Sequence, residues 1–457
     1  MTKQPDAISA NVSKSAGPAG LGAIFLIIFI DLVGFSIIFP LFPGMLDYYL
    51  SREGETGLLG WLLDFLNRFE QPGSGSGHFT AVLFGGVLGS IYSFLQFLFA
   101  PVWGSLSDRI GRRNILLLTT AGTAGSYLLW FFSGSFLLFV IARLIGGAMA
   151  GNLSVASAAI ADVTTAEGRA KGMALVGIAF GLGFTLGPAI GGLLAMWNPL
   201  ETWPDAGSWG LNPFSVPAAF AFLLATLNFV WVWLSFGETL PINKRRKTKG
   251  LGDRSPARML QIRREAAPVR RTNLVYFIYI FVFSGMEFTL TFLATQRFAF
   301  TPRDIGFMFV HIGLVLIITQ GLIVRKAVKH TGEKRMAAAG LALVLAAMFA
   351  IGFAGTVPAL FAGLTLMAVG SGLINPSLTA LVSLFARADR QGETLGIFRS
   401  LGSLGRAVGP LLASFVFWWF GSQVSYALAG VLMLIPLGIC LLLPRPDQGA
   451  QGSNRPT

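Results

Sequence analysis

The chain has 457 residues, of which 54% are hydrophobic and only 12% are charged, and its mean hydropathy is +0.67. A soluble domain usually carries about twice that share of charged residues. This composition excludes a disordered chain, a coiled coil and an ordinary water-soluble enzyme. Apolar runs of about 20 residues match the hydrocarbon thickness of a bilayer, so the sequence predicts an all-α, multi-pass integral membrane protein.

The net charge of +13 does not indicate a nucleic-acid-binding protein, because the basic residues are gathered in particular loops. Eleven of the 34 Lys and Arg residues lie in the segment 244–271, and most of the others occupy alternate short loops. That distribution is typical of cytoplasmic loops. We therefore predict a protein of the cell (inner) membrane with both termini in the cytoplasm. The first apolar run lacks a small-residue cleavage site, so no signal peptide is expected.

Twelve apolar segments are long enough to cross a bilayer as helices. They cover residues 22–44, 80–103, 114–133, 135–158, 172–196, 217–237, 273–295, 304–326, 336–355, 358–384, 394–419 and 423–443. The predicted domains are a tail (1–21), an N-terminal six-helix bundle (22–237), a basic cytoplasmic linker (238–272), a C-terminal six-helix bundle (273–443) and a second tail (444–457). The linker is rich in basic residues, which attract anionic lipid.

A short segment within the outer loop 45–79 does not fit this scheme. Residues 57–69 are too few to span, and they place apolar side chains on one helical face with Asp64, Asn67 and Arg68 on the other. This pattern predicts an amphipathic helix that lies on the outer membrane surface.

The two sets of six spans are related to each other. Gly187-Pro188 and Gly409-Pro410 are 222 residues apart, and Asn152 and Asn375 are 223 apart. Matching order and spacing indicate an internal duplication. A parallel repeat of two bundles predicts a substrate site between the halves, near the middle of the membrane.

Two glycine-rich motifs stand out. In GSLSDRIGRR (104–113), Gly104 and Gly111 allow a tight turn between two helices, and Asp108 forms a charge cluster with Arg109 and Arg112. In GFTLGPAIGG (183–192), small residues permit close helix packing, and a proline removes one backbone hydrogen bond. The residues of this second motif are Gly183, Gly187, Pro188, Gly191 and Gly192.

These motifs resemble those of the major facilitator superfamily (MFS). The segment 104–113 resembles motif A, RLIGGAMAG (143–151) resembles motif B, 183–192 fits the antiporter motif C, and DLVGFSIIFPLFP (31–43) resembles the first-helix motif of drug:H⁺ antiporters. The likeness covers about residues 20–444 and is greatest to the tetracycline-transporter-like drug:H⁺ antiporters. It implies a monomer with two pseudo-symmetric six-helix bundles.

The resemblance also implies roles for the motifs. Asp108 would help to lock the two halves on the cytoplasmic side, near the start of helix eleven, with Arg109 and Arg112 as supporting cations. The second copy of this loop, 325–335, has Lys329 in the place of Asp108, so the latch is expected in one half only. Motif C would bend and seal helix five.

Charged residues inside the predicted spans are the strongest functional signal, because each is costly in a bilayer and faces a partner or a cavity. Asp31 and Arg143 lie at similar depth in spans one and four. They are expected either to form a structural ion pair or to act together in proton exchange, with Arg143 tuning the protonation of Asp31.

Glu287 in span seven and two arginines in span eleven, Arg399 and Arg406, give the C-terminal half its own buried charges. A structural Glu–Arg bridge and a second protonation or substrate site both remain open. Arg406 occupies the repeat position of Phe184, which makes an anionic substrate conceivable. Further candidates for the substrate cavity are Phe35, Gln96, Asn152, His311, Gln320 and Asn375, although His311 also fits a satisfied core histidine.

The sequence thus predicts a secondary active transporter and not an enzyme, with no cofactor and no metal site. The expected activity is proton-coupled antiport (efflux) of small amphipathic or aromatic-bearing compounds by alternating access. The alternative is a uniporter or proton symporter of a metabolite or organic anion. Expected partners are a small-molecule substrate, protons and membrane lipids, with no nucleic acid.

Overall fold

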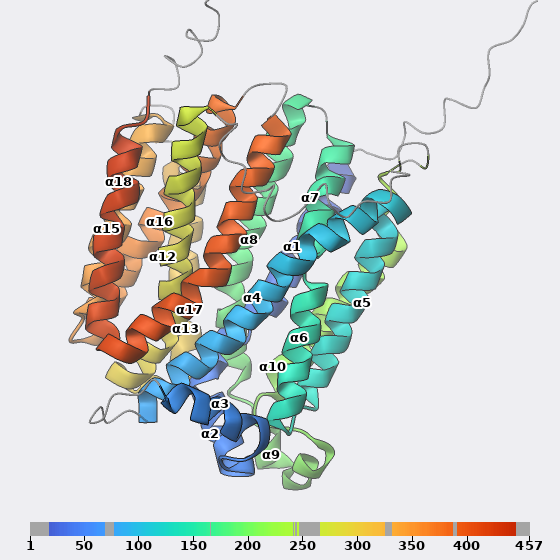
Figure 1. Cartoon of the computed structure of the whole chain (residues 1–457), viewed down its shortest axis with the longest axis vertical. Coiled ribbons are helices and arrows are strands. Elements are labelled where there is room, and N and C mark those ends of the chain that lie inside the picture. The colour runs from blue at the N-terminus through green and yellow to red at the C-terminus, as the bar shows by residue number, and fades with distance from the viewer. Residues whose placement is uncertain are drawn as a thin grey trace, which may run out of the picture.

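The computed structural model describes residues 18–68, 77–164, 166–240, 242, 245, 266–324, 331–386 and 391–444. In this part of the chain every regular element is a helix (Figure 1). The N-terminal half contains α1 (Pro18–Ser36), η1 (Phe39–Leu41), α2 (Phe42–Glu53), α3 (Gly57–Asn67), α4 (Gly77–Ile110), α5 (Arg112–Phe131), α6 (Phe136–Met149), α7 (Asn152–Val163), α8 (Ala166–Leu194), α9 (Pro199–Thr202), η2 (Pro204–Trp209) and α10 (Ser215–Ser235). The C-terminal half contains α12 (Ala267–Phe298), α13 (Pro302–Ile318), the π-helical η6 (Thr319–Val324), α15 (Glu333–Gly352), α16 (Val357–Phe385), α17 (Gln391–Leu432) and α18 (Leu434–Leu441).

Helices lie over all twelve predicted spans, and nine described segments are long and apolar enough to cross a membrane. The predicted ends differ in two places. The first span continues through η1 and α2 to Glu53. Although the sequence of α2 contains many polar residues, Met45, Leu46 and Tyr49 form one apolar face of the helix, and this face is buried. The eleventh and twelfth spans meet at Gly421, whose φ of 80° is a left-handed conformation that glycine adopts without strain.

The bundle has two distinct ends. We call the end at which α10 finishes and α12 begins the linker end, and the opposite end, where α2, α3 and α9 gather in Figure 1, the α3 end. Most of the linker and both tails fall outside the described residues. The assignment of the linker end to the cytoplasm stays a prediction.

Small residues bring the two halves into close contact toward the α3 end. A Cβ atom on Gly192 of α8 would meet Pro302 and Gly306 of α13, and a Cβ on Gly86 of α4 would meet Ser414 of α17. Helix α8 packs against α13, and α4 packs against α17. The halves are therefore pressed together at this end, where no larger side chain fits between the backbones.

Motif C does more inside its own half than we expected. Gly183, Gly187 and Gly191 face α1, where added Cβ atoms would meet Leu32, Ser36 and Ile37, and only Gly192 faces the other half. Ser36 Oγ donates a hydrogen bond to the Gly183 carbonyl oxygen at 3.0 Å. The helix α8 continues through Pro188 to Leu194. Three of the four glycines of this motif therefore pack within the N-terminal half, and one packs against the C-terminal half.

The predicted short helix is present as α3, although residue 69 lies outside the described part. Leu59, Leu62 and Leu63 are buried against the bundle. Trp61 and Phe65 are exposed and stack on each other with ring centroids 5.9 Å apart. The apolar face of the helix is thus wide, with one part packed on the bundle and the part around Trp61 and Phe65 exposed. Its location on the membrane surface stays a prediction.

Candidate functional site

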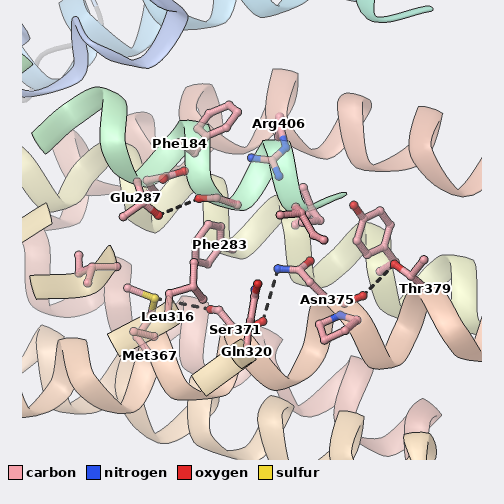
Figure 2. Close-up of a pocket in the computed structure, with 18 of the residues that line it drawn as sticks. Phe184, Phe283, Glu287, Leu316, Gln320, Met367, Ser371, Asn375, Thr379 and Arg406 are labelled. Carbon is pink, nitrogen blue, oxygen red and sulfur yellow. Dashed lines mark hydrogen bonds between the residues drawn. The ribbon is translucent and has the colours of Figure 1, made fainter. Parts of the chain in front are cut away.

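A cavity of about 460 Å³ lies mainly within the C-terminal half (Figure 2). Its walls come from α12, α13, η6, α15, α16 and α17, and the N-terminal half contributes only α8. The cavity extends toward the linker end, where Glu333, Leu384 and Leu395 lie at the ends of their helices. The apolar lining includes Phe184, Phe283, Phe309, Leu316 and Met367. This is the size and composition of a pocket for a small organic molecule.

Aromatic rings fill the space between this cavity and α2. We call Phe35, Phe39, Phe42, Phe184 and Phe288 the aromatic plug. Phe184 lies 5.6 Å from Phe35 and 6.1 Å from Phe39, measured between ring centroids. Phe288 lies 6.1 Å from Phe39 and 5.5 Å from Phe42. Because Phe288 is on α12 and the other rings are on α1, η1, α2 and α8, the plug joins the two halves.

Three of the predicted charged residues share the cavity wall. Glu287 on α12 is buried. Its carboxyl group is close enough to the Arg406 guanidinium on α17 for the two charges to attract each other. The Arg406 guanidinium lies over the Phe184 ring, with Cζ 4.4 Å from the ring centroid. Arg399, two turns closer to the linker end, donates a hydrogen bond to the Tyr276 hydroxyl at 3.4 Å. The structure therefore places Glu287, Arg399 and Arg406, all three of them candidates from the sequence, in the wall of one cavity.

Opposite these charges, α16 presents a row of polar side chains at helical spacing. Figure 2 shows Ser371, Asn375 and Thr379 on one wall, with Phe184 and Arg406 on another. The Asn375 amide donates to the Tyr279 hydroxyl and to the Ser371 carbonyl oxygen, both at 3.4 Å. Gln320 of η6 also lines the cavity. Asn375 and Gln320, both candidates from the sequence, line this cavity, and their contact with a substrate stays a prediction. Ser371 and Thr379 were missed because single hydroxyls are common in membrane helices.

His311 does not line the cavity. Its Nε2 atom is 2.9 Å from the Thr365 hydroxyl, and its ring packs edge-on against Phe361. The neighbours of His311 in sequence, Phe309 and Ile312, are the ones that reach the cavity. Of the two expectations for His311, these contacts fit the satisfied core histidine, because the helix turns its neighbours toward the cavity instead.

Asp31 lies in a separate and much smaller space. It is half-buried on α1 and lines a crevice of about 10 Å³ together with Gln96 of α4 and Asn152 of α7. Gln96 Nε2 donates to the Ala150 carbonyl oxygen at 3.0 Å. These three candidates do come together, but around a space that admits no organic solute.

Arg143 does not pair directly with Asp31. Among the ion pairs of the described residues, none joins these two side chains. The Arg143 guanidinium instead lies over the Tyr92 ring at 4.3 Å and near the Phe35 ring at 5.8 Å, and its Nε and Nη2 atoms are buried without a hydrogen bond. Tyr92 and Phe35 take the place beside the guanidinium that a carboxylate would need. Phe35 thus belongs to the plug rather than to the cavity lining.

Motif A forms a compact ion cluster at the linker end. Arg112 pairs with Asp108 at 2.7 Å and with Asp162 of α7 at 2.9 Å. Its backbone N–H donates to Glu238, which follows α10, at 2.9 Å. Gly111 has a φ of 106°, and a Cβ there would collide with Glu238. The sequence prediction missed Glu238, although an acidic residue at the start of a basic linker was a usable signal.

Arg109 takes a different position from the one expected. It is exposed, and within the described residues it makes none of the contacts that hold this cluster together. Gly104 is buried, and its carbonyl oxygen accepts a hydrogen bond from Ser107 at 2.8 Å. Asp108 is buried as well. A role of Asp108 as a latch toward helix eleven stays a prediction.

Comparisons with known proteins agree with this architecture. The family model of the Major Facilitator Superfamily matches residues 24–330 and 272–456. "Major facilitator superfamily domain-containing protein 10" of Bos taurus is 36% identical over 446 residues, covering 93% of each chain. The class D tetracycline resistance protein of Salmonella ordonez is 27% identical over 434 residues, covering 92% of this chain and 96% of that protein.

Two solved structures show the same fold. The crystal structure of the human organic anion transporter MFSD10 (TETRAN) is 34% identical, covers 93% of this chain and 100% of its own, and superposes with a TM-score of 0.73. An inward-facing, unoccupied bacterial homolog of the human lysosomal transporter Spinster superposes with a TM-score of 0.65 at 12% identity, with 96% and 99% coverage. The latter likeness concerns the fold alone.

Proposed function

Because the chain belongs to the Major Facilitator Superfamily, whose members are transporters and not enzymes, we propose that it moves amphipathic organic anions across the membrane by alternating access. The observation that carries this proposal is the cavity that combines Arg399 and Arg406 with an apolar and aromatic wall. The likeness to the human protein named as an organic anion transporter supports the same substrate class.

The cavity suits such a solute in both of its parts. A guanidinium group is planar, always charged and offers paired N–H donors to a carboxylate, sulfonate or phosphate. Phe283, Phe309 and Leu316 offer apolar contact to the body of the molecule. Ser371 and Asn375 add polar groups on the opposite wall. An anion therefore gains charge-assisted hydrogen bonds at one end and apolar burial at the other.

Glu287 supplies a means of coupling to protons. It lies in the same cavity as the two arginines, and Glu333 stands at the mouth toward the linker end. Protonation of Glu287 removes a negative charge next to the anion, so proton and anion favour each other's binding by Coulomb's law. Because each ligand favours binding of the other, the two would be carried in the same direction. That is proton–anion symport, the alternative that the sequence left open.

Asp31 supports a second candidate, the proton-coupled antiport predicted from sequence. Its crevice of about 10 Å³ admits a proton but not a solute, and it is separate from the large cavity. In this scheme the proton and the substrate bias one conformational equilibrium from two different sites. The relatives named as tetracycline resistance proteins favour this candidate as well.

The test uses purified protein in proteoliposomes with radiolabelled naphthalene sulfonate as the anion and naphthalene sulfonamide as its neutral counterpart. The parent protein should take up the sulfonate, and Arg406→Gln should lose at least about thirtyfold of that uptake, as for one partner of a buried charge pair. Arg303→Gln is the control, because Arg303 is an exposed arginine of the same half outside the cavity. Equal uptake of sulfonate and sulfonamide would contradict the anion proposal.

A pH-sensitive dye inside the same vesicles separates the two coupling schemes. Symport through Glu287 predicts that protons move with the anion and that Glu287→Gln uncouples this movement. Antiport through Asp31 predicts the opposite direction of proton movement and uncoupling by Asp31→Asn.

A further inference from the structure

The Arg406 side chain in the cavity contacts the aromatic plug through the Phe184 ring. Its Cζ lies 4.4 Å from the centroid of Phe184, and both residues line the cavity. Phe184 and Arg406 are also 222 residues apart, the spacing that relates Gly187 to Gly409. The two repeat-related positions thus meet each other across the interface between the halves, one as an aromatic ring and the other as a cation.

The same ring is part of the plug. Phe184 contacts Phe35 at 5.6 Å and Phe39 at 6.1 Å, and Phe39 reaches Phe288 of the C-terminal half at 6.1 Å. On the far side of Phe35, the Arg143 guanidinium lies 5.8 Å from that ring. Two arginines from different halves, the buried Arg143 and the half-buried Arg406, therefore stand at the two ends of one pair of contacting rings, Phe184 and Phe35.

Beyond the plug, the halves are held together by a contact that leaves no space for solvent. Ser414 of α17 is fully buried, and a Cβ on Gly86 of α4 would collide with its side chain. The α4 backbone also presses on the plug, since a Cβ on Gly85 would come within 2.9 Å of Phe292 and 3.2 Å of Phe288. Opening of the α3 end requires that α4 and α17 separate at these positions.

We propose that Phe184 couples anion binding to the opening of the α3 end. A cation above a ring is attracted by the ring quadrupole, whereas an anion offers the same guanidinium charge-assisted hydrogen bonds, which are stronger. An anion that binds Arg406 draws the guanidinium off the Phe184 ring. The plug then loses the contact that holds Phe184 toward the C-terminal half. This inference rests on the proposed anion transport and adds the residue that transmits binding to the gate.

Phe184 is a positioning residue in this account, because it acts through Arg406 and the plug. Simple packing would make any fully buried phenylalanine of the helices that separate equivalent to it. Phe84 of α4 provides that comparison, since it is fully buried against Phe136, does not line the cavity, and carries no arginine over its ring in the described part of the chain. Phe184→Leu removes the quadrupole and keeps an apolar side chain, and Phe184→Tyr keeps the ring.

The experiment follows the contact at Ser414 with a cysteine reporter. Ser414→Cys is introduced together with Cys440→Ser, which removes the single native cysteine. The labelling rate of the reporter by a hydrophilic maleimide is measured in detergent with and without naphthalene sulfonate, and the dissociation constant of the sulfonate is measured on the same samples. Detergent exposes both ends of the protein, so the result does not depend on topology.

In the otherwise unchanged reporter protein, the sulfonate should raise the labelling rate about tenfold, the factor that corresponds to loss of a desolvated cation–π contact. In Phe184→Leu the sulfonate should still bind within about threefold of the parent affinity, but the labelling rate should change less than about twofold. Phe184→Tyr and Phe84→Leu should retain the full response.

A full sulfonate response in Phe184→Leu, or a labelling rate that the sulfonate does not change in the reporter protein, would overturn this proposal and leave anion transport intact. Loss of the response in Phe84→Leu to the same degree would also overturn it, because the effect would then be packing. Failure of the reporter protein to bind sulfonate at all would overturn the proposed function and this inference together.

Discussion

The two halves of the molecule carry similar buried charges but use them differently. In the N-terminal half, Asp31 and Arg143 are separated, and each is surrounded closely by Asn152, Tyr92 or Phe35. In the C-terminal half, Glu287, Arg399 and Arg406 share a cavity of about 460 Å³. The repeat-related asparagines show the same contrast, since Asn152 lies in the crevice beside Asp31 and Asn375 lies on the open cavity wall. The comparison teaches that a duplicated fold can form an open cavity in one half and a packed charge site in the other.

The largest effect is expected from removing a cavity charge. Arg406→Gln should weaken binding of naphthalene sulfonate at least about thirtyfold, because an anion then loses its charged partner in a low-dielectric site. Arg143→Gln, the corresponding change in the packed half, should leave sulfonate affinity within about threefold of the parent value. Titration calorimetry on both variants measures this. Equal losses of sulfonate affinity in Arg406→Gln and Arg143→Gln would contradict the claim that only the C-terminal half binds the anion.

A second prediction separates the two carboxylates. Glu287→Gln should abolish the dependence of sulfonate affinity on pH, because the neutral amide mimics the protonated acid beside Arg406. Asp31→Asn should leave that dependence unchanged, since its crevice is separate from the cavity. Sulfonate affinities measured at a series of pH values between weakly acidic and weakly alkaline buffer provide the check. If sulfonate affinity became independent of pH in Asp31→Asn but kept its normal pH dependence in Glu287→Gln, Asp31 and not Glu287 would be the carboxylate that couples protons to the anion.

A third prediction compares two glycines of one helix. In α8, a Cβ on Gly191 would collide with the Ile37 backbone, whereas a Cβ on Gly181 would meet only Leu316 and Gln320 at 3.9 and 4.0 Å. Gly191→Ala should therefore destabilise the protein by about 1–3 kcal/mol through overpacking, and Gly181→Ala should be neutral. Thermal unfolding in the same detergent gives both values. A neutral Gly191→Ala would show that α1 can move away from α8 without cost.

The smallest effect is expected at His311. Its bond to Thr365 is a typical neutral hydrogen bond, so His311→Leu should cost about 1 kcal/mol of stability and leave sulfonate uptake unchanged. Uptake in proteoliposomes and thermal unfolding test the two parts. A strong loss of uptake would return His311 to the substrate pathway.

Much of this fold could be predicted because apolar runs and loop charges report directly on membrane helices. The extension of the first span to Glu53 was missed, since α2 is polar on one face and only its structure shows Met45 and Tyr49 buried. The break at Gly421 and the placement of α3 depend on contacts between distant segments.

The site was predictable residue by residue but not as a set. Each buried charge was visible in sequence, yet the rotation of each helix decides which groups face one another. Asp31 and Arg143 lie at similar depth and still do not pair, while Glu287 and Arg406 share one cavity. The stacking of Arg406 on Phe184 was not predicted, although the repeat alignment had already placed these two residues at equivalent positions.

The central claim is that the solute binds in the C-terminal cavity and not near Asp31. Photo-cross-linking with an azide-bearing naphthalene sulfonate, followed by peptide mass spectrometry, tests it most directly. The account predicts adducts on cavity residues of α12, α16 and α17, such as Phe283, Met367 and Leu395, and their loss in Arg406→Gln. Adducts concentrated on α1, α4 and α7 around Asp31, and unaffected by Arg406→Gln, would contradict it.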